Sequence, residues 1–224
     1  MPHPCNWDIY FDTPHLRALE CSVHLLRHSK FYAPNISRLY IKTSCHLSSP
    51  LRPHIPFYKD LRHLHLPNTS VRTLCSTIIS FPRLETIAVD KIEHSGNVLD
   101  GRMYSATLES MTLPLPSSYE SYYFQQEFIN MFGLLHLPNF RKLTLVGTPK
   151  KQRVRDLLPV LAAASFQVPV VDFPTDAPLR KVHMSSIESL LSVVGEVTFC
   201  GNVLQIDKRR NSRRRGKLKL RYSR

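Results

Sequence analysis

The stretch LRHLHLPNTSVRTLCSTIISFPRLETIAVDKI, residues 61–92, contains two copies of one short pattern. The pattern is an apolar residue, two variable residues, an apolar residue, one variable residue and an apolar residue, and LRHLHL and LETIAV both follow it. Between the copies, PNT predicts a turn, and SVRTLCSTIIS predicts a helix because its apolar residues recur at helical spacing. Ser70 or Thr69 is expected to cap this helix, and Phe81-Pro82 to end it before the next strand.

The same pattern recurs along most of the chain, which indicates an internal repeat. The remaining copies are Leu16-Leu19-Cys21, Ile36-Leu39-Ile41, Leu108-Met111-Leu113, Phe140-Leu143-Leu145, Leu179-Val182-Met184 and, as an eighth candidate, Val194-Val197-Phe199. The first seven copies start 20, 25, 23, 24, 32 and 39 residues apart. Intervals of 20–29 residues are typical of leucine-rich repeats, and the two longer ones require insertions. Residues 119–132 and 155–165 are expected to be helices of the longer units.

A unit of this size is too small to bury its own apolar face, so neighbouring units must stack and share a core. The sequence therefore predicts an α/β fold, an irregular leucine-rich-repeat arc (a right-handed solenoid) with a parallel sheet on its concave side and short helices outside. Residues 1–206 are predicted to form this domain, and residues 207–224 a disordered basic tail.

The segments LRHLHLPNTSVRTLCSTIISFPRLETIAVDKI, LPNFRKLTLVGT and APLRKVHM resemble the degenerate repeats of fungal F-box proteins, over about residues 14 to 190. The resemblance implies a substrate-recognition role in a ubiquitin ligase that a Skp1-type adaptor recruits through an F-box. The F-box itself is not visible, because the first copy begins at Leu16. The asparagine that follows the leucine pattern in regular repeats is also missing, so the turns must satisfy their backbone groups in another way.

Charge and cysteine usage bear on the partner and the compartment. Of 30 Lys and Arg residues, ten lie within residues 208–224, so the basicity belongs to the tail. The five cysteines are scattered and include no CxxC pair. The sequence shows no signal peptide and no apolar stretch long enough to span a membrane. These features predict a soluble intracellular protein, cytoplasmic or nuclear, and we expect a monomer.

Residues between the inner apolar positions of each predicted strand should face outward, on the concave surface. Thr86 and Ala88 are expected there, together with a mildly basic strip that would suit an acidic or phosphate-bearing partner. The predicted partner-binding residues are Arg38, Tyr40, Lys42, His63, His65, Lys142, Thr144, Lys181 and His183. The alternative interpretation of the strip is a solvated polar face.

No motif for catalysis or cofactor binding is present, and we expect a binding protein rather than an enzyme, with no cofactor. Cys21, His24 and His28, with Cys45-His46, have spacings that zinc could use. The favoured interpretation is that Cys21 packs in the core, so no metal site is predicted.

The leading hypothesis is therefore a protein-protein interaction module with an unidentified protein partner. The alternative is a basic nucleic-acid-associated protein that acts through its tail, because runs of basic residues bind phosphates or direct nuclear import. The tail residues in question are Lys208, Arg209, Arg210, Arg213, Arg214, Arg215, Lys217 and Lys219.

Overall fold

The computed structural model describes residues 9–22, 29–42, 58–93, 101–115, 121–147, 151–174, 184–206 and 218–221. Within these residues the central element is a ten-stranded sheet, eight strands of which are parallel. In spatial order the parallel strands are β2 (Ala18–Cys21), β4 (Arg38–Ile41), β5 (His63–Ser70), β6 (Thr86–Glu93), β8 (Ser110–Pro114), β10 (Lys142–Val146), β11 (Val170–Phe173) and β12 (Glu196–Phe199). The prediction of an α/β fold with a parallel sheet is confirmed.

Shorter strands accompany this sheet. β1 (Ile9–Asp12) pairs in parallel with β3 (Ser29–Tyr32), and β7 (Met103–Tyr104) pairs in parallel with β9 (Leu135–His136). At one end of the large sheet, β13 (Asn202–Ile206) and β14 (Leu218–Arg221) add two antiparallel strands.

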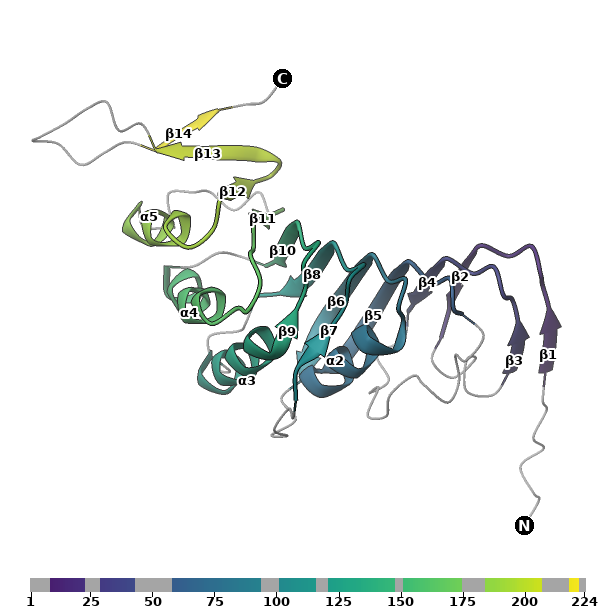
Figure 1. Ribbon diagram of the computed structural model, residues 1–224. Helices are drawn as coiled ribbons and strands as arrows, with labels where there is room; N and C mark the ends of the chain where they lie inside the picture. The colour runs from purple at the N-terminus through teal and green to yellow at the C-terminus, as the bar shows by residue number, and fades with distance from the viewer. Residues whose placement is uncertain are drawn as a thin grey trace, which may run out of the picture.

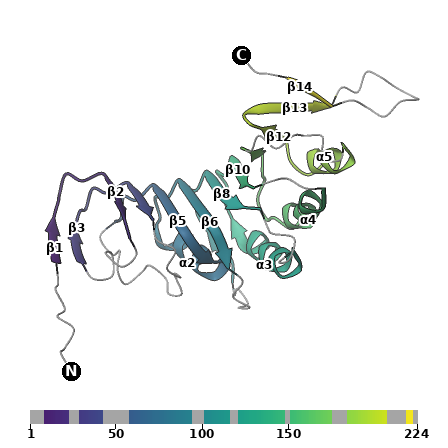
Figure 2. The ribbon, with the colours of Figure 1, turned by 180° about the vertical axis from the view of Figure 1, so that it is seen from behind.

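Four helices cover one face of the described sheet: α2 (Val71–Ser80), α3 (Ser121–Leu134), α4 (Lys151–Ala162) and α5 (Met184–Leu191). The sheet bends along its length, and these helices follow the outer side of the bend (Figure 1). The view from behind shows the same arrangement (Figure 2). The opposite face of the sheet, which we call the open face, therefore lies on the inner side of the bend.

The apolar triplets found in the sequence build the core between sheet and helices. The central member of each triplet stands in register with that of the next strand, in the series Leu39, Leu64, Ile87, Met111, Leu143, Val171 and Val197. All seven are at most 2% exposed. Complete burial of one such side chain stabilises a fold by roughly 1.5–3 kcal/mol, so this ladder makes a large contribution to stability.

A hydrogen-bonded turn precedes most of the strands. The amide of the first triplet residue donates to the carbonyl three residues earlier, as from Ile36 to Ala33 over 3.2 Å and from Leu84 to Phe81 over 3.1 Å. Proline, whose fixed φ suits the second position of such a turn, occupies it at Pro14, Pro34 and Pro82.

In three of the turns, a polar side chain at the third position connects the turn to its neighbour. The Asn35 amide donates to the Pro14 carbonyl over 2.6 Å, the Thr107 hydroxyl donates to the Pro82 carbonyl over 3.0 Å, and the Asn139 amide donates to the Ala106 carbonyl over 2.6 Å. These contacts satisfy carbonyl groups of the turns that precede the strands.

In the repeat at residues 61–92 the predicted helix and its cap are confirmed, but the turn predicted at PNT is wrong. These residues belong to β5, where Asn68 and Thr69 pair with Lys91 and Ile92 of β6. Ser70 is the N-cap of α2, and its hydroxyl accepts a hydrogen bond from the Thr73 amide over 3.2 Å. The helix ends at Ser80, just before Phe81-Pro82. The helices expected at residues 119–132 and 155–165 are present as α3 and α4, each shifted by a few residues.

The seventh predicted copy is wrong. Leu179 and Val182 lie outside the described residues, and Met184 begins helix α5 rather than ending a strand. The strand at this place is β11, with Val168, Val171 and Phe173 as its buried triplet. Val168 follows Phe140 by 28 residues and precedes Val194 by 26, so the long interval of 39 residues disappears. The eighth candidate is correct, because its residues are buried at β12.

The prediction of a disordered tail is wrong for residues 218–221. These residues form β14, which pairs antiparallel with β13, because alternating leucines and cations suit a strand. β13 itself follows a tight turn at Cys200 and Gly201, whose φ values of 49° and 76° both lie in the left-handed region. Two such residues are typical of a two-residue hairpin. The rest of the tail lies outside the described residues.

Candidate functional site

The open face presents two rows of side chains that run across the strands in register. The row nearer the start of the strands is Ala18, Arg38, His63, Thr86, Ser110, Lys142, Val170 and Glu196. The second row is Glu20, Tyr40, His65, Ala88, Thr112, Thr144, Asp172 and Thr198. Of the nine predicted partner-binding residues, Arg38, Tyr40, His63, His65, Lys142 and Thr144 therefore lie in these rows. Lys42 follows β4, and Lys181 and His183 lie outside the described residues.

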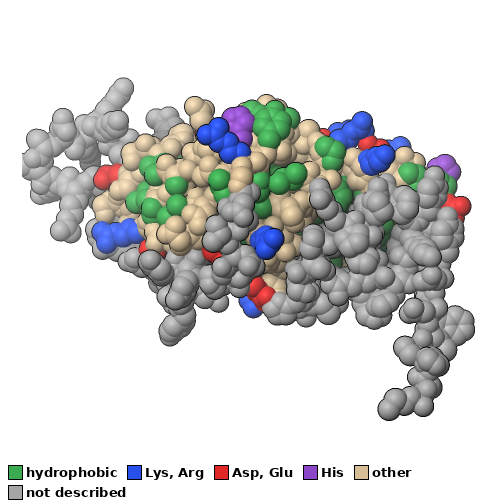
Figure 3. Space-filling model, turned by 60° about the horizontal axis from the view of Figure 1, so that its bottom comes forward, with side chains coloured by type: hydrophobic (Ala, Val, Ile, Leu, Met, Phe, Trp, Pro, Cys, Tyr) green, Lys and Arg blue, Asp and Glu red, His purple; other side chains and the backbone are tan. Residues whose placement is uncertain are grey.

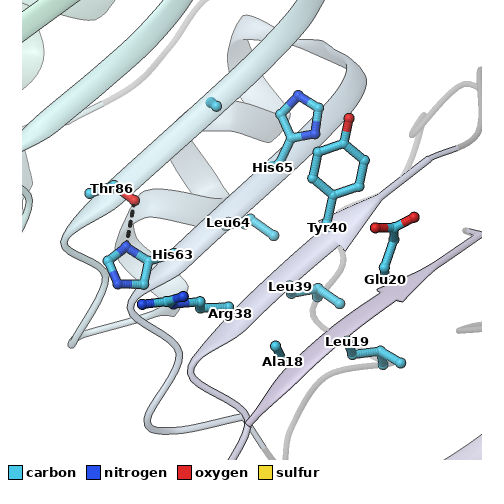
Figure 4. Close-up of a pocket in the computed structure, with 11 residues that line it drawn as sticks. Ala18, Leu19, Glu20, Arg38, Leu39, Tyr40, His63, Leu64, His65 and Thr86 are labelled. Carbon is cyan, nitrogen blue, oxygen red and sulfur yellow. Dashed lines mark hydrogen bonds between the residues drawn. The ribbon is translucent and has the colours of Figure 1, made fainter.

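Four of the predicted residues come together around one hollow in the open face, over β2, β4, β5 and β6 (Figure 4). The hollow has a volume of about 410 Å³. Its lining side chains include Arg38, Tyr40, His63 and His65, together with Ala18, Glu20, Thr86 and Ala88. We call it the β4–β5 hollow, since those strands supply its most polar side chains.

One end of the β4–β5 hollow is aromatic. The rings of Tyr40 and His65 lie on each other, with centroids 4.1 Å apart and an angle of 32° between their planes. Nε2 of His65 lies 2.8 Å from a carboxylate oxygen of Asp90, which orients the imidazole. Tyr40 remains 42% exposed, so part of its side chain is accessible to a bound group.

The other end is basic. Nδ1 of His63 lies 2.8 Å from the Thr86 hydroxyl, and Figure 4 shows the Arg38 guanidinium beside the His63 ring. Within the described residues, Arg38 has no carboxylate partner, whereas Arg62 on the same sheet is paired with Glu85 at 2.7 Å. A guanidinium beside an imidazole has the hydrogen-bond donors that recognition of an oxyanion requires.

The predicted basic strip is corrected by the acids that share this face. Lys42 forms an ion pair with Glu20. The hydrogen bond that the Lys42 ammonium group donates to this carboxylate, together with the carboxylate's charge, raises the pKa of Lys42. Asp90 faces His65 in the same way. The described side chains of the two rows, together with Lys42 and Asp90, include four acids (Glu20, Asp90, Asp172 and Glu196) and three Lys or Arg residues (Arg38, Lys42 and Lys142), so the open face as a whole is not basic.

At the other end of the sheet the rows form a closed polar network. Lys142 lies 2.7 Å from a carboxylate oxygen of Asp172, and the Thr198 hydroxyl donates to the other oxygen over 2.5 Å. Asp172 and Thr198 are buried, in contrast to Glu20 and Tyr40 in the same row. The network holds strands β10, β11 and β12 together, and sequence reasoning missed it because β11 was assigned to the wrong residues.

Figure 3 brings the lower side of Figure 1 forward. On this face the described Lys and Arg side chains are scattered, and some of them lie beside acidic or apolar groups. This matches the balance of charge in the sequence, where residues 1–207 have 20 basic and 17 acidic side chains after the tail is set aside.

Cys21 occupies the core position expected of it. It is buried, and burial raises the pKa of its thiol to about 11, while burial raises that of Cys75 to about 12. Thiols that stay protonated at neutral pH are poor nucleophiles and poor metal ligands. The histidines and Cys45 of the candidate zinc set lie outside the described residues. In the described ranges no three His, Cys, Asp or Glu side chains are arranged to hold a metal ion.

These features define an α/β protein whose mostly parallel sheet is covered by helices on one face and hollowed on the other. None of the helices in the described ranges combines the length and apolar character needed to cross a bilayer. No protein-family model, curated protein or solved structure matches the chain.

Proposed function

We propose that this chain is a leucine-rich-repeat protein that binds a protein partner on its open face. The receptor role that the F-box resemblance implies, recognition of substrates for ubiquitination, is the narrower form of the proposal. The β4–β5 hollow carries the proposal, because it brings an exposed aromatic ring together with a cation that has no carboxylate partner among the described residues, on a surface that no described element covers.

The unit length supports the leucine-rich-repeat assignment. When the seventh triplet is taken to start at Val168 rather than at Leu179, the eight triplets start at residues 16, 36, 61, 84, 108, 140, 168 and 194. Every interval is then between 20 and 32 residues, and six of the seven fall within the range typical of such repeats. The repeated turn and the in-register triplets are the same in units whose remaining parts differ.

The composition of the hollow supports binding. Tyrosine and arginine are among the side chains most enriched in residues that contribute strongly to protein interfaces. Tyr40 already has its ring held by His65, so its immobilisation on binding would cost little entropy. An aromatic ring that is fixed in place and still exposed is suited to recognition.

A photocrosslinking experiment tests the proposal. Tyr40 is replaced by p-benzoylphenylalanine, a ring of related shape, and the full chain is irradiated in a lysate of its own cells. Arg72, an exposed residue of α2 on the helical face, carries the same group in the control chain. We expect a discrete crosslinked protein from position 40 and none from position 72. Equal crosslinking from both positions, or none from position 40 in a folded chain, would contradict the proposal.

The second candidate is nucleic-acid binding through the tail, which the ten basic residues within 208–224 favour. Such binding weakens steeply with salt, because each neutralised phosphate releases counterions. If it operates, deletion of residues 208–224 should abolish retention of a labelled RNA or DNA at 50 mM salt and leave the position-40 crosslink intact. Retention of nucleic acid by the truncated chain would contradict this second candidate.

A further inference from the structure

We propose that the β4–β5 hollow recognises an extended peptide segment that carries one carboxylate side chain and, two residues away, an apolar or aromatic side chain. The carboxylate pairs with Arg38, and the apolar side chain lies on Tyr40. This inference rests on the proposed function and names the chemistry of the partner.

The charges around the hollow favour a single negative charge. Glu20 already neutralises Lys42, so the side chains that line the hollow leave one cation, Arg38, without a carboxylate partner among the described residues. A carboxylate matches the planar fork of the guanidinium and balances its charge. A phosphate group would bring about 1.5 to 2 negative charges, of which the single charge of Arg38 balances only one.

His63 supplies a second donor beside Arg38. Its Nδ1 is engaged with the Thr86 hydroxyl at 2.8 Å. When that hydroxyl donates its proton to Nδ1, Nε2 carries the ring proton and presents an N–H group. The two oxygens of one carboxylate can then accept from Arg38 and His63 together, as the side-by-side placement in Figure 4 allows.

The spacing of the two ends sets the spacing of the peptide side chains. Arg38 and Tyr40 are two residues apart on β4, and so are His63 and His65 on β5. Alternate residues of a strand lie roughly 7 Å apart on one face. A bound segment that extends along the strands has the same repeat, so its side chains i and i+2 meet the basic and the aromatic end.

A peptide library screened against the full chain tests this inference. Immobilised hexapeptides vary one position among Asp, Glu, Asn, Gln and phosphoserine, and vary the position two residues away among Leu, Phe, Ser and Lys. We expect the chain to select Asp or Glu with Leu or Phe. Charge-assisted hydrogen bonds contribute about 1.5–3 kcal/mol, so Arg38→Gln should weaken binding of the selected peptide by about tenfold or more.

Two controls make the outcome specific. Arg72→Gln removes an exposed guanidinium from the helical face and should leave the affinity unchanged. Replacing Asp by Asn in the peptide should weaken its binding to the original chain. The same replacement should have little further effect on binding to the Arg38→Gln variant, because that variant has already lost the pair between Arg38 and the peptide carboxylate.

Several results would overturn the inference. They are preference for phosphoserine over Asp and Glu, equal losses for Arg38→Gln and Arg72→Gln, and selection of no acidic peptide. If the position-40 crosslink is present while the library shows any of these results, the partner chemistry is wrong and the binding function stands. If the crosslink also fails, the proposed function fails.

Discussion

Leu64→Ala should destabilise the protein by about 3 kcal/mol or more. Leu64 is 2% exposed and lies in register between Leu39 on β4 and Ile87 on β6. The substitution removes three carbon atoms from a site that two neighbouring strands enclose, so it loses transfer free energy and leaves a cavity. Thr112→Ala on the open face of β8 is the control and should change the free energy of unfolding by no more than about 0.5 kcal/mol.

A pair of double-mutant cycles then tests the order of the strands. Ile87 is the direct neighbour of Leu64, so Leu64→Ala and Ile87→Val should be coupled by about 0.5 kcal/mol or more. Val171 lies four strand spacings away, on β11, which corresponds to roughly 19 Å. Leu64→Ala and Val171→Ala should therefore be additive to within about 0.5 kcal/mol.

Urea denaturation followed by circular dichroism gives the free energies for both cycles. If Leu64 couples to Val171 as strongly as to Ile87, the two residues are not separated along one sheet and the reasoning is refuted. The same holds if Leu64→Ala costs no more than Thr112→Ala.

Two further predictions concern α2. Ser70→Ala removes the N-cap acceptor of the Thr73 amide and should lower the free energy of unfolding, measured by urea denaturation, by about 1 kcal/mol. The control, Ser76→Ala in the helix interior, should be close to neutral. Equal effects of the two substitutions would exclude a capping role for Ser70. Burial raises the pKa of the Cys75 thiol from 9.0 to about 12. Above pH 9 the unfolded thiol loses its proton while the folded thiol keeps it, so stability should fall as pH rises from 9 towards 12, by about 1 kcal/mol per unit. Cys75→Ala should reduce that slope, and an unchanged slope would contradict the assignment.

The sequence predicted the parallel sheet because its deciding signal is local. A triplet such as Leu61, Leu64 and Leu66 marks both the strand and its inward side, and similar intervals predict that the strands stack. The pattern failed at β11 because VPVVDF is apolar at almost every position, so its triplet is not distinguished from its neighbours. Continuous apolar runs are typical of strands that are buried on both faces, and alternation cannot be used to place them.

The hollow was predicted in part. Arg38, Tyr40, His63 and His65 follow from the alternation of side chains along β4 and β5. The neutralisation of Lys42 by Glu20 does not, because it depends on the register between β2 and β4, which no local pattern specifies. The error at β11 also hid Asp172, and with it the acid that pairs with Lys142.

The stacked turns have a consequence for how such a chain can change over time. Several turns are joined to their neighbours by side-chain hydrogen bonds, as Asn35 is to Pro14, whereas the stretch of sequence between one triplet and the next differs in length from unit to unit. Insertions and deletions between the triplets can therefore accumulate without shifting the residues of the open face. The open face and the connecting segments can thus evolve at different rates, and a designer could lengthen the connecting segments while keeping the side chains of the open face in place.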